Sequence, residues 1–208
     1  MASPFFDRRA AGAQLARLLK PRPDPVVLGI ARGGVVVAAS VALALRAPLD
    51  MLVVRKVGHP LQPELAIGAV TANGEGVSTP HAAFFPGPLA QILFARARRE
   101  AQALEHRLRG EIPPLDLAGR NVIVVDDGVA TSATMLCALQ AARRRQAATV
   151  TCAVPVGPVD SLNLLRAHCD DMAVLIAARE VPFAVGRYYF SFNEVSDARV
   201  RDELARKT

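Results

Sequence analysis

The chain has 208 residues, of which 51% are hydrophobic, and its formal net charge is +6 at neutral pH. This length suits one α/β domain with a substantial core, so we expect a single domain over residues 1–208. No apolar run is long enough to span a bilayer, and the first twenty residues lack the apolar region of a secretory signal. The composition therefore argues against a membrane protein and against a membrane partner.

The cysteines and the positive charge narrow the class of protein and the kind of ligand further. Cys137, Cys152 and Cys169 sit in apolar segments without CxxC spacing, which argues against a zinc site and a disulfide framework. We therefore expect reduced core residues in a cytoplasmic protein. The charge suits either nucleic acid or a ligand with several phosphates. The dense arginine runs fall on expected helices without interleaved aromatic residues, which favours solvated helix faces.

The first predicted strand and helix frame a possible anion site. A helix is expected over residues 7–20, ended by the proline-rich segment 21–25, which also opens a buried strand over residues 25–30. Ala31-Arg32-Gly33-Gly34 follows, and then a helix over residues 35–46. A strand that turns through glycines into a helix offers backbone N–H groups to an anion, and Arg32 adds a cation.

Residues 49–88 place two cations near that turn and then lose the regular spacing of apolar residues. Residues 49–54 predict a strand, and Arg55 and Lys56 follow it, at the edge where open α/β sheets bind ligands. Residues 63–70 predict another strand before an Asn-Gly hairpin turn. Residues 71–88 are rich in Gly, Pro, Ser and His and show no clear periodicity, so we expect a flexible loop. The sequence assigns no role to His81, which lies in this loop, or to His59, which precedes it. A long helix over residues 89–109 follows.

The most informative stretch is Asn121 to Met135, NVIVVDDGVATSATM. Four β-forming residues make a buried strand, and Asp126 and Asp127 follow at its carboxyl end. Small and hydroxyl residues then lead into a helix, whose free N–H groups suit a phosphate. Carboxylates beside a phosphate cradle suit sugar hydroxyls or a hydrated cation. The stretch predicts a ligand with a phosphate and a polyol, although an acidic pair alone often only caps a helix.

The remaining chain completes an alternation of strands and helices. Strands are expected over residues 149–156 and 172–177 with a helix over residues 161–168 between them, and a closing helix covers residues 196–206. The pattern predicts an α/β fold with a Rossmann-like parallel sheet and helices on both faces, its core spanning about residues 25–178. Residues 180–195 gather aromatic side chains and predict a small hood, in which Tyr188 could stack on a planar base.

Residues 122–134 resemble the ribose-5-phosphate binding signature of the type I phosphoribosyltransferases, particularly the stand-alone bacterial domains of unassigned acceptor. The resemblance implies that Asp126 and Asp127 hold the ribose hydroxyls of phosphoribosyl pyrophosphate (PRPP). Ser132 stands where the family usually has Gly, so it either strains the loop or adds a hydroxyl donor. The residues that the resemblance assigns to the 5′-phosphate are Ala130, Thr131, Ser132, Ala133 and Thr134.

The same resemblance assigns the pyrophosphate half of the site. It implies that Ala31, Arg32, Gly33 and Gly34, with Lys56, bind pyrophosphate, and it makes Ala31–Arg32 a candidate for a cis peptide bond. Arg55 and Lys56 join the acidic pair as catalytic residues by neutralising the leaving group. The cofactor is Mg²⁺ carried by PRPP, without a dedicated protein site, and water-bridged to Asp126 or Asp127.

The function that the resemblance implies is that of a pentosyltransferase in nucleotide salvage. It would transfer 5-phosphoribosyl from Mg-PRPP to a nitrogen acceptor, with a nucleobase as the expected small-molecule acceptor, and release pyrophosphate. The acceptor's identity does not follow from the sequence. A homodimer is expected and a nucleic-acid partner is not. The alternative is a non-catalytic PRPP-sensing regulator that binds nucleic acid, which the positive charge permits.

Overall fold

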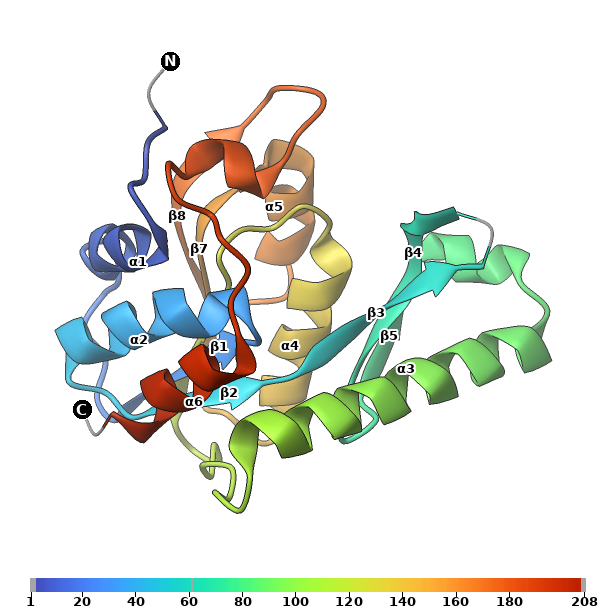
Figure 1. The fold of residues 1–208 in the computed structure, drawn as a ribbon, viewed down its shortest axis with the longest axis horizontal. Coiled ribbons are helices and arrows are strands. Elements are labelled where there is room, and N and C mark those ends of the chain that lie inside the picture. The colour runs from blue at the N-terminus through green and yellow to red at the C-terminus, as the bar shows by residue number, and fades with distance from the viewer. Residues whose placement is uncertain (1–2, 61, 207–208) are drawn as a thin grey trace.

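The computed structural model describes residues 3–60 and 62–206, with residues 62–65 as backbone only. Its main sheet has five parallel strands in the order β2-β1-β6-β7-β8 (Figure 1). This order reverses direction between β1 and β6, which are therefore neighbours although residues 31–120 lie between them in the chain. The strands are β1 (Pro25–Ile30), β2 (Leu49–Leu52), β6 (Asn121–Val125), β7 (Thr149–Pro158) and β8 (Asp171–Ala178).

Helices cover both faces of this sheet, which confirms the predicted fold class. On one face lie α1 (Arg8–Ala16) and α2 (Gly33–Leu45), and on the other lie α4 (Ser132–Arg144) and α5 (Val159–Arg166). Alternate residues of each central strand face opposite helices: Val27 packs with α1 and α2, whereas Leu28 packs with α4. The closing helix α6 (Asp197–Ala205) packs against α2.

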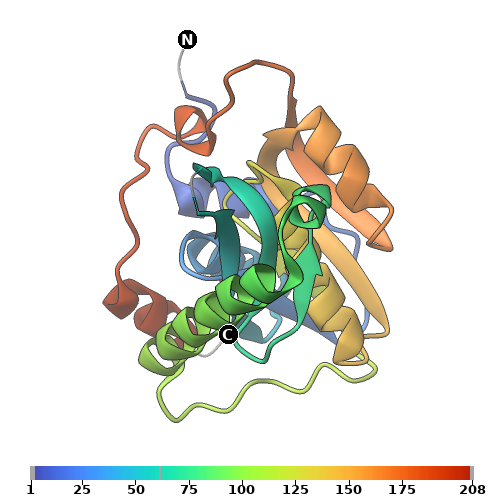
Figure 2. The same ribbon diagram turned by 90° about the vertical axis from the view of Figure 1, so that its right-hand side faces the viewer.

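A second, antiparallel sheet was not expected from the sequence. Its strands are β3 (Val54–His59), β4 (Gln62–Thr71) and β5 (Gly76–Ser78), in the order β3-β4-β5. The long helix α3 (Gly87–Arg109) covers one of its faces, and together they form an arm that projects from the main sheet (Figures 1 and 2). We call β3, β4, β5 and α3 the arm.

The arm changes the expectation for residues 71–88. The segment predicted as a flexible loop contains β5 and a 3₁₀ helix, η1 (Pro80–Phe84). Strand β5 forms because the Asn-Gly turn brings it back beside β4. The turn is closed by the Gly74 amide, which donates to the Thr71 carbonyl at 3.0 Å, and Gly74 has a φ of 95°. The extent of motion in this segment stays a prediction.

Two element boundaries also differ from the sequence predictions. The first helix ends at Ala16 instead of Lys20, and its last turn tightens there, since the Arg17 and Leu18 amides donate to the carbonyls three residues before them. The predicted strand over residues 49–54 is divided at Val53, where the chain leaves the main sheet and enters the arm. The side chain of Val53 is buried among Met51, Ala72 and Leu104, so this crossing point is packed on both sides.

A buried ion pair connects the end of α3 to the edge strand β2. The Arg109 Nη1 donates to Asp50 Oδ1 at 2.7 Å, and its Nη2 donates to the Met51 carbonyl at 3.0 Å. The other Asp50 oxygen accepts the Leu115 amide at 2.9 Å. Both side chains are less than 10% exposed, and the pair joins β2 to the end of α3 and the segment that follows it.

The three cysteines are free thiols packed in or beside the core. Burial raises the pKa of Cys137 to about 12, and burial likewise raises the pKa of Cys152 and Cys169. Since the thiolate is the reactive form, native thiols at neutral pH should react slowly with a disulfide reagent. We expect at most Cys169, the only half-buried thiol of the three, to be titrated in the folded protein and all three in guanidinium chloride. Rapid titration of two or more native thiols would contradict this packing.

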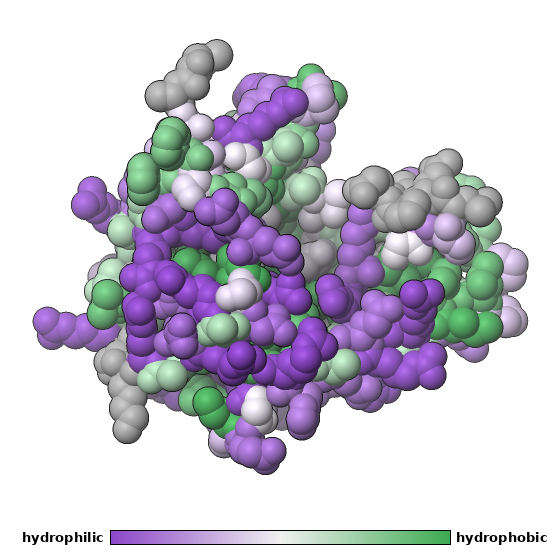
Figure 3. Space-filling view, viewed as in Figure 1, coloured by the Kyte–Doolittle hydropathy of each residue, from purple (hydrophilic) through white to green (hydrophobic). Residues whose placement is uncertain are grey.

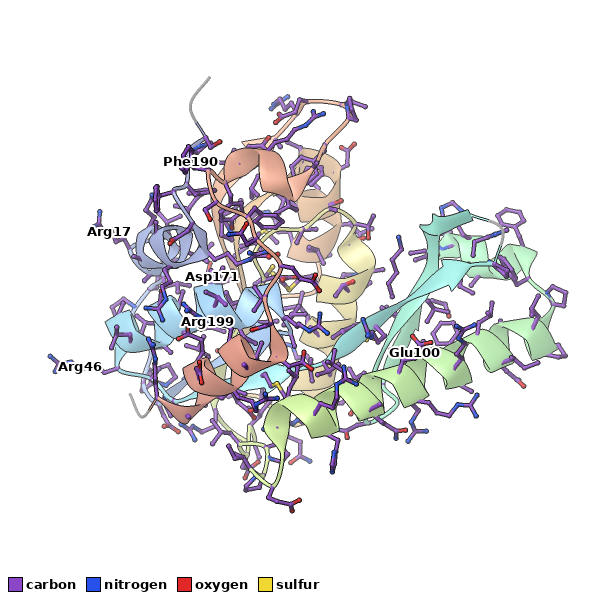
Figure 4. The ribbon with its side chains drawn as sticks, in the orientation of Figure 1. Arg17, Arg46, Glu100, Asp171, Phe190 and Arg199 are labelled. Carbon is purple, nitrogen blue, oxygen red and sulfur yellow. The ribbon has the colours of Figure 1, made fainter. Side chains whose placement is uncertain are left out.

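The surface carries polar residues over the helices and an apolar patch at the free end of the arm (Figure 3). Phe84, Leu89 and Ile92 are exposed there. Arg17 and Arg46 extend away from the molecule beside α1 and α2, as expected for solvated helix faces (Figure 4). Among the helices that the structure describes, none combines the length and the apolar character needed to cross a membrane.

Candidate active site

The carboxyl ends of β1 and β6 meet at the point where the strand order reverses. Gly29 of β1 lies opposite Val125 of β6, so the turn that starts at Ala31 lies beside Asp126. Ligands of open α/β sheets bind in the crevice at such a switch point. The strand register therefore brings together the two anion-binding turns that the sequence predicts separately.

The two aspartates form a compact acidic pair at the end of β6. Asp126 Oδ1 accepts the Asp127 amide at 2.8 Å, so the Asp126 side chain is held against the backbone of Asp127. Burial and the neighbouring Asp127 raise the pKa of Asp126 well above its ordinary value. Burial also raises the pKa of Asp127, whereas the Arg8 guanidinium opposes this rise. The raised pKa values show that this site disfavours two ionised carboxylates, and within the described part of the chain only Asp127 is paired with a cation, Arg8.

The glycines of the β1–α2 turn make room for this acidic pair. A Cβ atom at Gly33 would lie 2.0 Å from Asp127 Oδ2, and one at Gly34 would lie 2.8 Å from Asp126 Oδ1. A side chain at either position would displace the carboxylates or the backbone. Close approach to Asp126 and Asp127 thus gives both glycines a role besides the predicted contact with pyrophosphate.

The β6–α4 turn ends in an uncapped helix N-terminus. Thr131 is the N-cap residue of α4, and its side chain makes no capping hydrogen bond. The first-turn N–H groups of a 13-residue helix are thereby available to an anion. Ala130 and Thr131 are exposed and Ser132 and Thr134 are half-buried, whereas the Ala133 side chain is buried.

Ser132 does not strain this turn. It is the first residue of α4 and has helical backbone, so the left-handed conformation that would favour glycine is not required. The backbone of Ser132 therefore causes no strain, and the donor role of its hydroxyl stays a prediction.

Arg32 faces a different neighbour from the one expected. The Ala31–Arg32 peptide is cis, as the resemblance leads us to expect, and Arg32 is the N-cap residue of α2. Its Nε lies 2.8 Å from Asp197 Oδ1 and its Nη1 lies 3.2 Å from Glu194 Oε1. The guanidinium is therefore engaged by carboxylates of the C-terminal segment and has to exchange these partners to bind pyrophosphate.

Arg55 and Lys56 do not point to the same side, although the sequence predicts that both cations face the ligand crevice. They follow β2 but belong to β3 of the arm, where successive side chains point to opposite faces. Lys56 pairs with Ala69, whose side chain packs in the core with α4. Arg55 pairs with Val70, which packs on the α3 side. Lys56 therefore lies on the face of the arm sheet that packs against α4, whereas Arg55 lies on the face that packs against α3.

The aromatic hood is also built differently. Tyr188 is 8% exposed and packs with Phe5 and Phe183, which is a satellite core and not an open stacking platform. The neighbouring Tyr189 reaches the site instead, since its hydroxyl donates to the Asp127 carbonyl at 2.6 Å. Burial raises the pKa of Tyr189, so the hydroxyl keeps its proton and remains a donor. Sequence reasoning missed Tyr189, which carries no local signal that separates it from Tyr188.

Arg8 is the second residue that sequence reasoning missed. Its Nε donates to Asp127 Oδ2 at 2.7 Å, although 119 residues separate the two in the chain. In the sequence Arg8 is one of several arginines of an amphipathic helix, and no spacing pattern points to Asp127. The acidic pair of the site is thus completed by a cation from α1.

Residues 8–188 match the family model described as the phosphoribosyl transferase domain. A protein of Mycobacterium tuberculosis strain H37Rv, whose name assigns it provisionally to the phosphoribosyl transferases, is 42% identical over 201 residues. The matched region covers 94% of this chain and 45% of that protein, so the chain spans about half the length of this curated relative.

A curated enzyme matches less than half of this chain, whereas a solved structure matches nearly all of it. The uracil phosphoribosyltransferase of Renibacterium salmoninarum is 31% identical over 94 residues, which cover 45% of this chain and 44% of that enzyme. The crystal structure of TT1426 from Thermus thermophilus has a TM-score of 0.82 and 41% identity, covering 96% of this chain and 97% of that one. Since the family model spans most of the sequence and a solved relative matches along its whole length, the chain belongs to the phosphoribosyl transferase family.

Proposed function

We propose that this domain transfers the 5-phosphoribosyl group of PRPP to a nitrogen of a small acceptor, with a nucleobase as the acceptor class. The observation that carries the proposal is the meeting of the acidic pair, the α4 N-terminus and the glycine turn of β1 at one switch point. A carboxylate pair between two anion-binding turns matches a sugar that carries a phosphate at one end and a pyrophosphate at the other.

Each half of the site has a role in this proposal. The first-turn amides of Ser132, Ala133 and Thr134 and the Thr131 hydroxyl hold the 5′-phosphate. Asp126 and Asp127 hold the ribose hydroxyls and stabilise the positive charge that develops on the sugar. The turn between β1 and α2, which contains Gly33 and Gly34, binds the pyrophosphate together with Lys56. Arg55 has no part in this proposal, because it lies on the other face of the arm sheet from Lys56.

The reaction follows from these positions. The bond between the sugar C1′ and the pyrophosphate oxygen breaks, and its electron pair leaves with pyrophosphate. The acceptor nitrogen forms the new bond to C1′ and then releases its proton. Positioning and charge supply the rate enhancement, since none of these residues forms a covalent intermediate.

Magnesium enters this proposal with the substrate. Among the described residues, no group of three or more His, Cys, Asp or Glu side chains lies close enough together to hold a metal ion. The carboxyl groups of Asp126 and Asp127 nevertheless suit a hydrated cation bound mainly by phosphate oxygens, since a nearby cation favours their ionised form. When bound, Mg²⁺ would neutralise the leaving pyrophosphate. The homodimer, the cytoplasmic location and the single-domain organisation stay predictions.

Calorimetric titration with PRPP and Mg²⁺, ribose 5-phosphate and pyrophosphate tests the proposal. We expect PRPP to bind more tightly than either fragment, because it spans both turns. Binding of PRPP without turnover of any nucleobase would instead favour the PRPP-sensing regulator, whose RNA affinity should depend strongly on salt. A protein that binds none of the three ligands would contradict the proposed function.

The matched variant for this titration is Asp126→Asn combined with Asp127→Asn, which removes the charge while preserving side-chain size. Hydrogen bonds to charged groups contribute about 1.5–3 kcal/mol each, so PRPP affinity should fall at least about tenfold. The titration of this double variant should leave pyrophosphate binding unchanged. Unaltered PRPP affinity in a folded double variant would remove the acidic pair from the site.

A further inference from the structure

Helix α1 carries Arg8 to the acidic pair through its close packing on α2. Asp7 caps the helix by accepting the Ala10 amide at 2.8 Å, which fixes where the first turn begins. Gly12 allows the two helices to approach closely, since a Cβ there would lie 2.5 Å from the Val37 carbonyl oxygen. The first turn of α1 therefore lies against the turn that opens α2, and Arg8 projects from it toward Asp127.

The guanidinium of Arg8 is fixed by three different contacts. Its Nε donates to Asp127 Oδ2 at 2.7 Å, and its Nη1 donates to the Asn193 carbonyl at 2.8 Å. Its central carbon lies 3.8 Å from the centre of the Phe192 ring, which adds a cation–π contact. The side chain is only 12% exposed, so this is an ordered and largely desolvated cation and not a surface arginine.

The same contact lies directly against the glycine turn. A Cβ at Gly33 would be 3.0 Å from Arg8 Nε as well as 2.0 Å from Asp127 Oδ2. Asp127 is further held through its carbonyl by the Tyr189 hydroxyl, and the Tyr189 ring stacks on Phe192 at 4.9 Å. Side chain and backbone of Asp127 are thus both set by residues from outside β6.

We propose that Arg8 is a positioning residue of the PRPP site, which fixes the Asp127 carboxylate in the orientation that receives a ribose hydroxyl. This inference rests on the proposed function. With Oδ2 engaged by Arg8, the other oxygen of Asp127 meets the sugar, and the charge of one carboxylate of the pair is balanced without any ligand. Arg8 acts through Asp127 and makes no contact with the reacting atoms.

Two substitutions at position 8 separate its charge from its geometry. Arg8→Gln removes the charge, whereas Arg8→Lys keeps the charge and loses the planar fork. We expect Arg8→Gln to weaken PRPP and ribose 5-phosphate binding at least about tenfold, the effect of losing a charge-assisted hydrogen bond. Pyrophosphate binding should fall much less, because this ligand has no hydroxyl for Asp127 to hold. Arg8→Lys should restore part of the lost affinity.

Arg9→Gln is the matched control. Arg9 is the next residue of the same helix, but its Nη2 contacts Glu203 at 2.7 Å, beside Arg199 of α6 (Figure 4). This variant should leave the affinity for all three ligands unchanged. In the Asp127→Asn background, Arg8→Gln should cause no further loss of PRPP affinity, because the two residues act as one unit.

The outcomes distinguish this proposal from the proposed function. A wild-type protein that binds none of the three ligands overturns both. A wild-type protein that binds PRPP together with an Arg8→Gln variant of equal affinity overturns the role of Arg8 alone. Equal losses of PRPP and pyrophosphate binding in Arg8→Gln would also overturn it, since a general loosening of the fold acts on both turns. Selective loss of the ribose-containing ligands supports it.

Discussion

Replacing Gly33 by Ala should lower PRPP affinity by about 100-fold or more while the domain stays folded. The new methyl group would lie 2.0 Å from Asp127 Oδ2, so the carboxylate and Arg8 must move away. Displacing Asp127 removes charge-assisted hydrogen bonds to the ribose, each of which contributes about 1.5–3 kcal/mol, and the turn that faces pyrophosphate is distorted as well. The backbone itself should tolerate alanine, which favours the helical conformation that Gly33 already adopts in α2.

Titration of PRPP, with the unfolding free energy from urea denaturation measured in parallel, checks this expectation. Gly87→Ala is the matched control, because Gly87 begins α3 and a Cβ there would meet nothing within 4 Å. The control should bind PRPP as the wild type does. If Gly33→Ala binds PRPP with wild-type affinity, the close approach between the β1–α2 turn and Asp127 is not a requirement of the site.

Replacing Arg109 by Ala should lower the free energy of unfolding by about 3–5 kcal/mol, the range observed when one partner of a buried ion pair is removed. Asp50 would then remain buried without its cation, and the Met51 carbonyl would lose a donor. The loss concerns stability, because the pair lies between α3 and the edge strand β2 and contains no residue of the candidate site.

Urea denaturation followed by circular dichroism measures this change. Arg96→Ala offers a control on the same helix, since Arg96 pairs with Glu100 on the exposed surface at 3.0 Å. Exposed pairs of this kind contribute about 0–1 kcal/mol, so the control should stay close to the wild type. Equal stability losses in the two variants would contradict the distinction between the buried and the exposed pair.

The parallel sheet could be predicted from the sequence because its strands have a strong local signal. Val26 to Ile30 and Val122 to Val125 are uninterrupted apolar runs, each followed by a turn and a helix. The arm could not be predicted in the same way. Residues 54–59 mix charged, glycine and apolar positions, and only their pairing with β4 makes them a strand.

The site was predictable where one continuous segment builds it. Asp126, Asp127 and the start of α4 follow one another in the chain, so their proximity needed no knowledge of the tertiary structure. Arg8 and Tyr189 come from distant segments, and only the packing of α1 and of the C-terminal segment brings them to Asp127. The separation of Arg55 from Lys56 depends likewise on their being part of a strand.

The arm shares its hydrophobic core with the main sheet. Val54, Ala69 and Val77 of the arm pack in one cluster with Val124 and Leu139. A swing of the whole arm would therefore expose the apolar face of α4 to water and would require partial unfolding. We therefore expect any motion that closes over a bound ligand to be confined to the free end of the arm, whose residues Val57 and Ile67 pack outside this shared cluster.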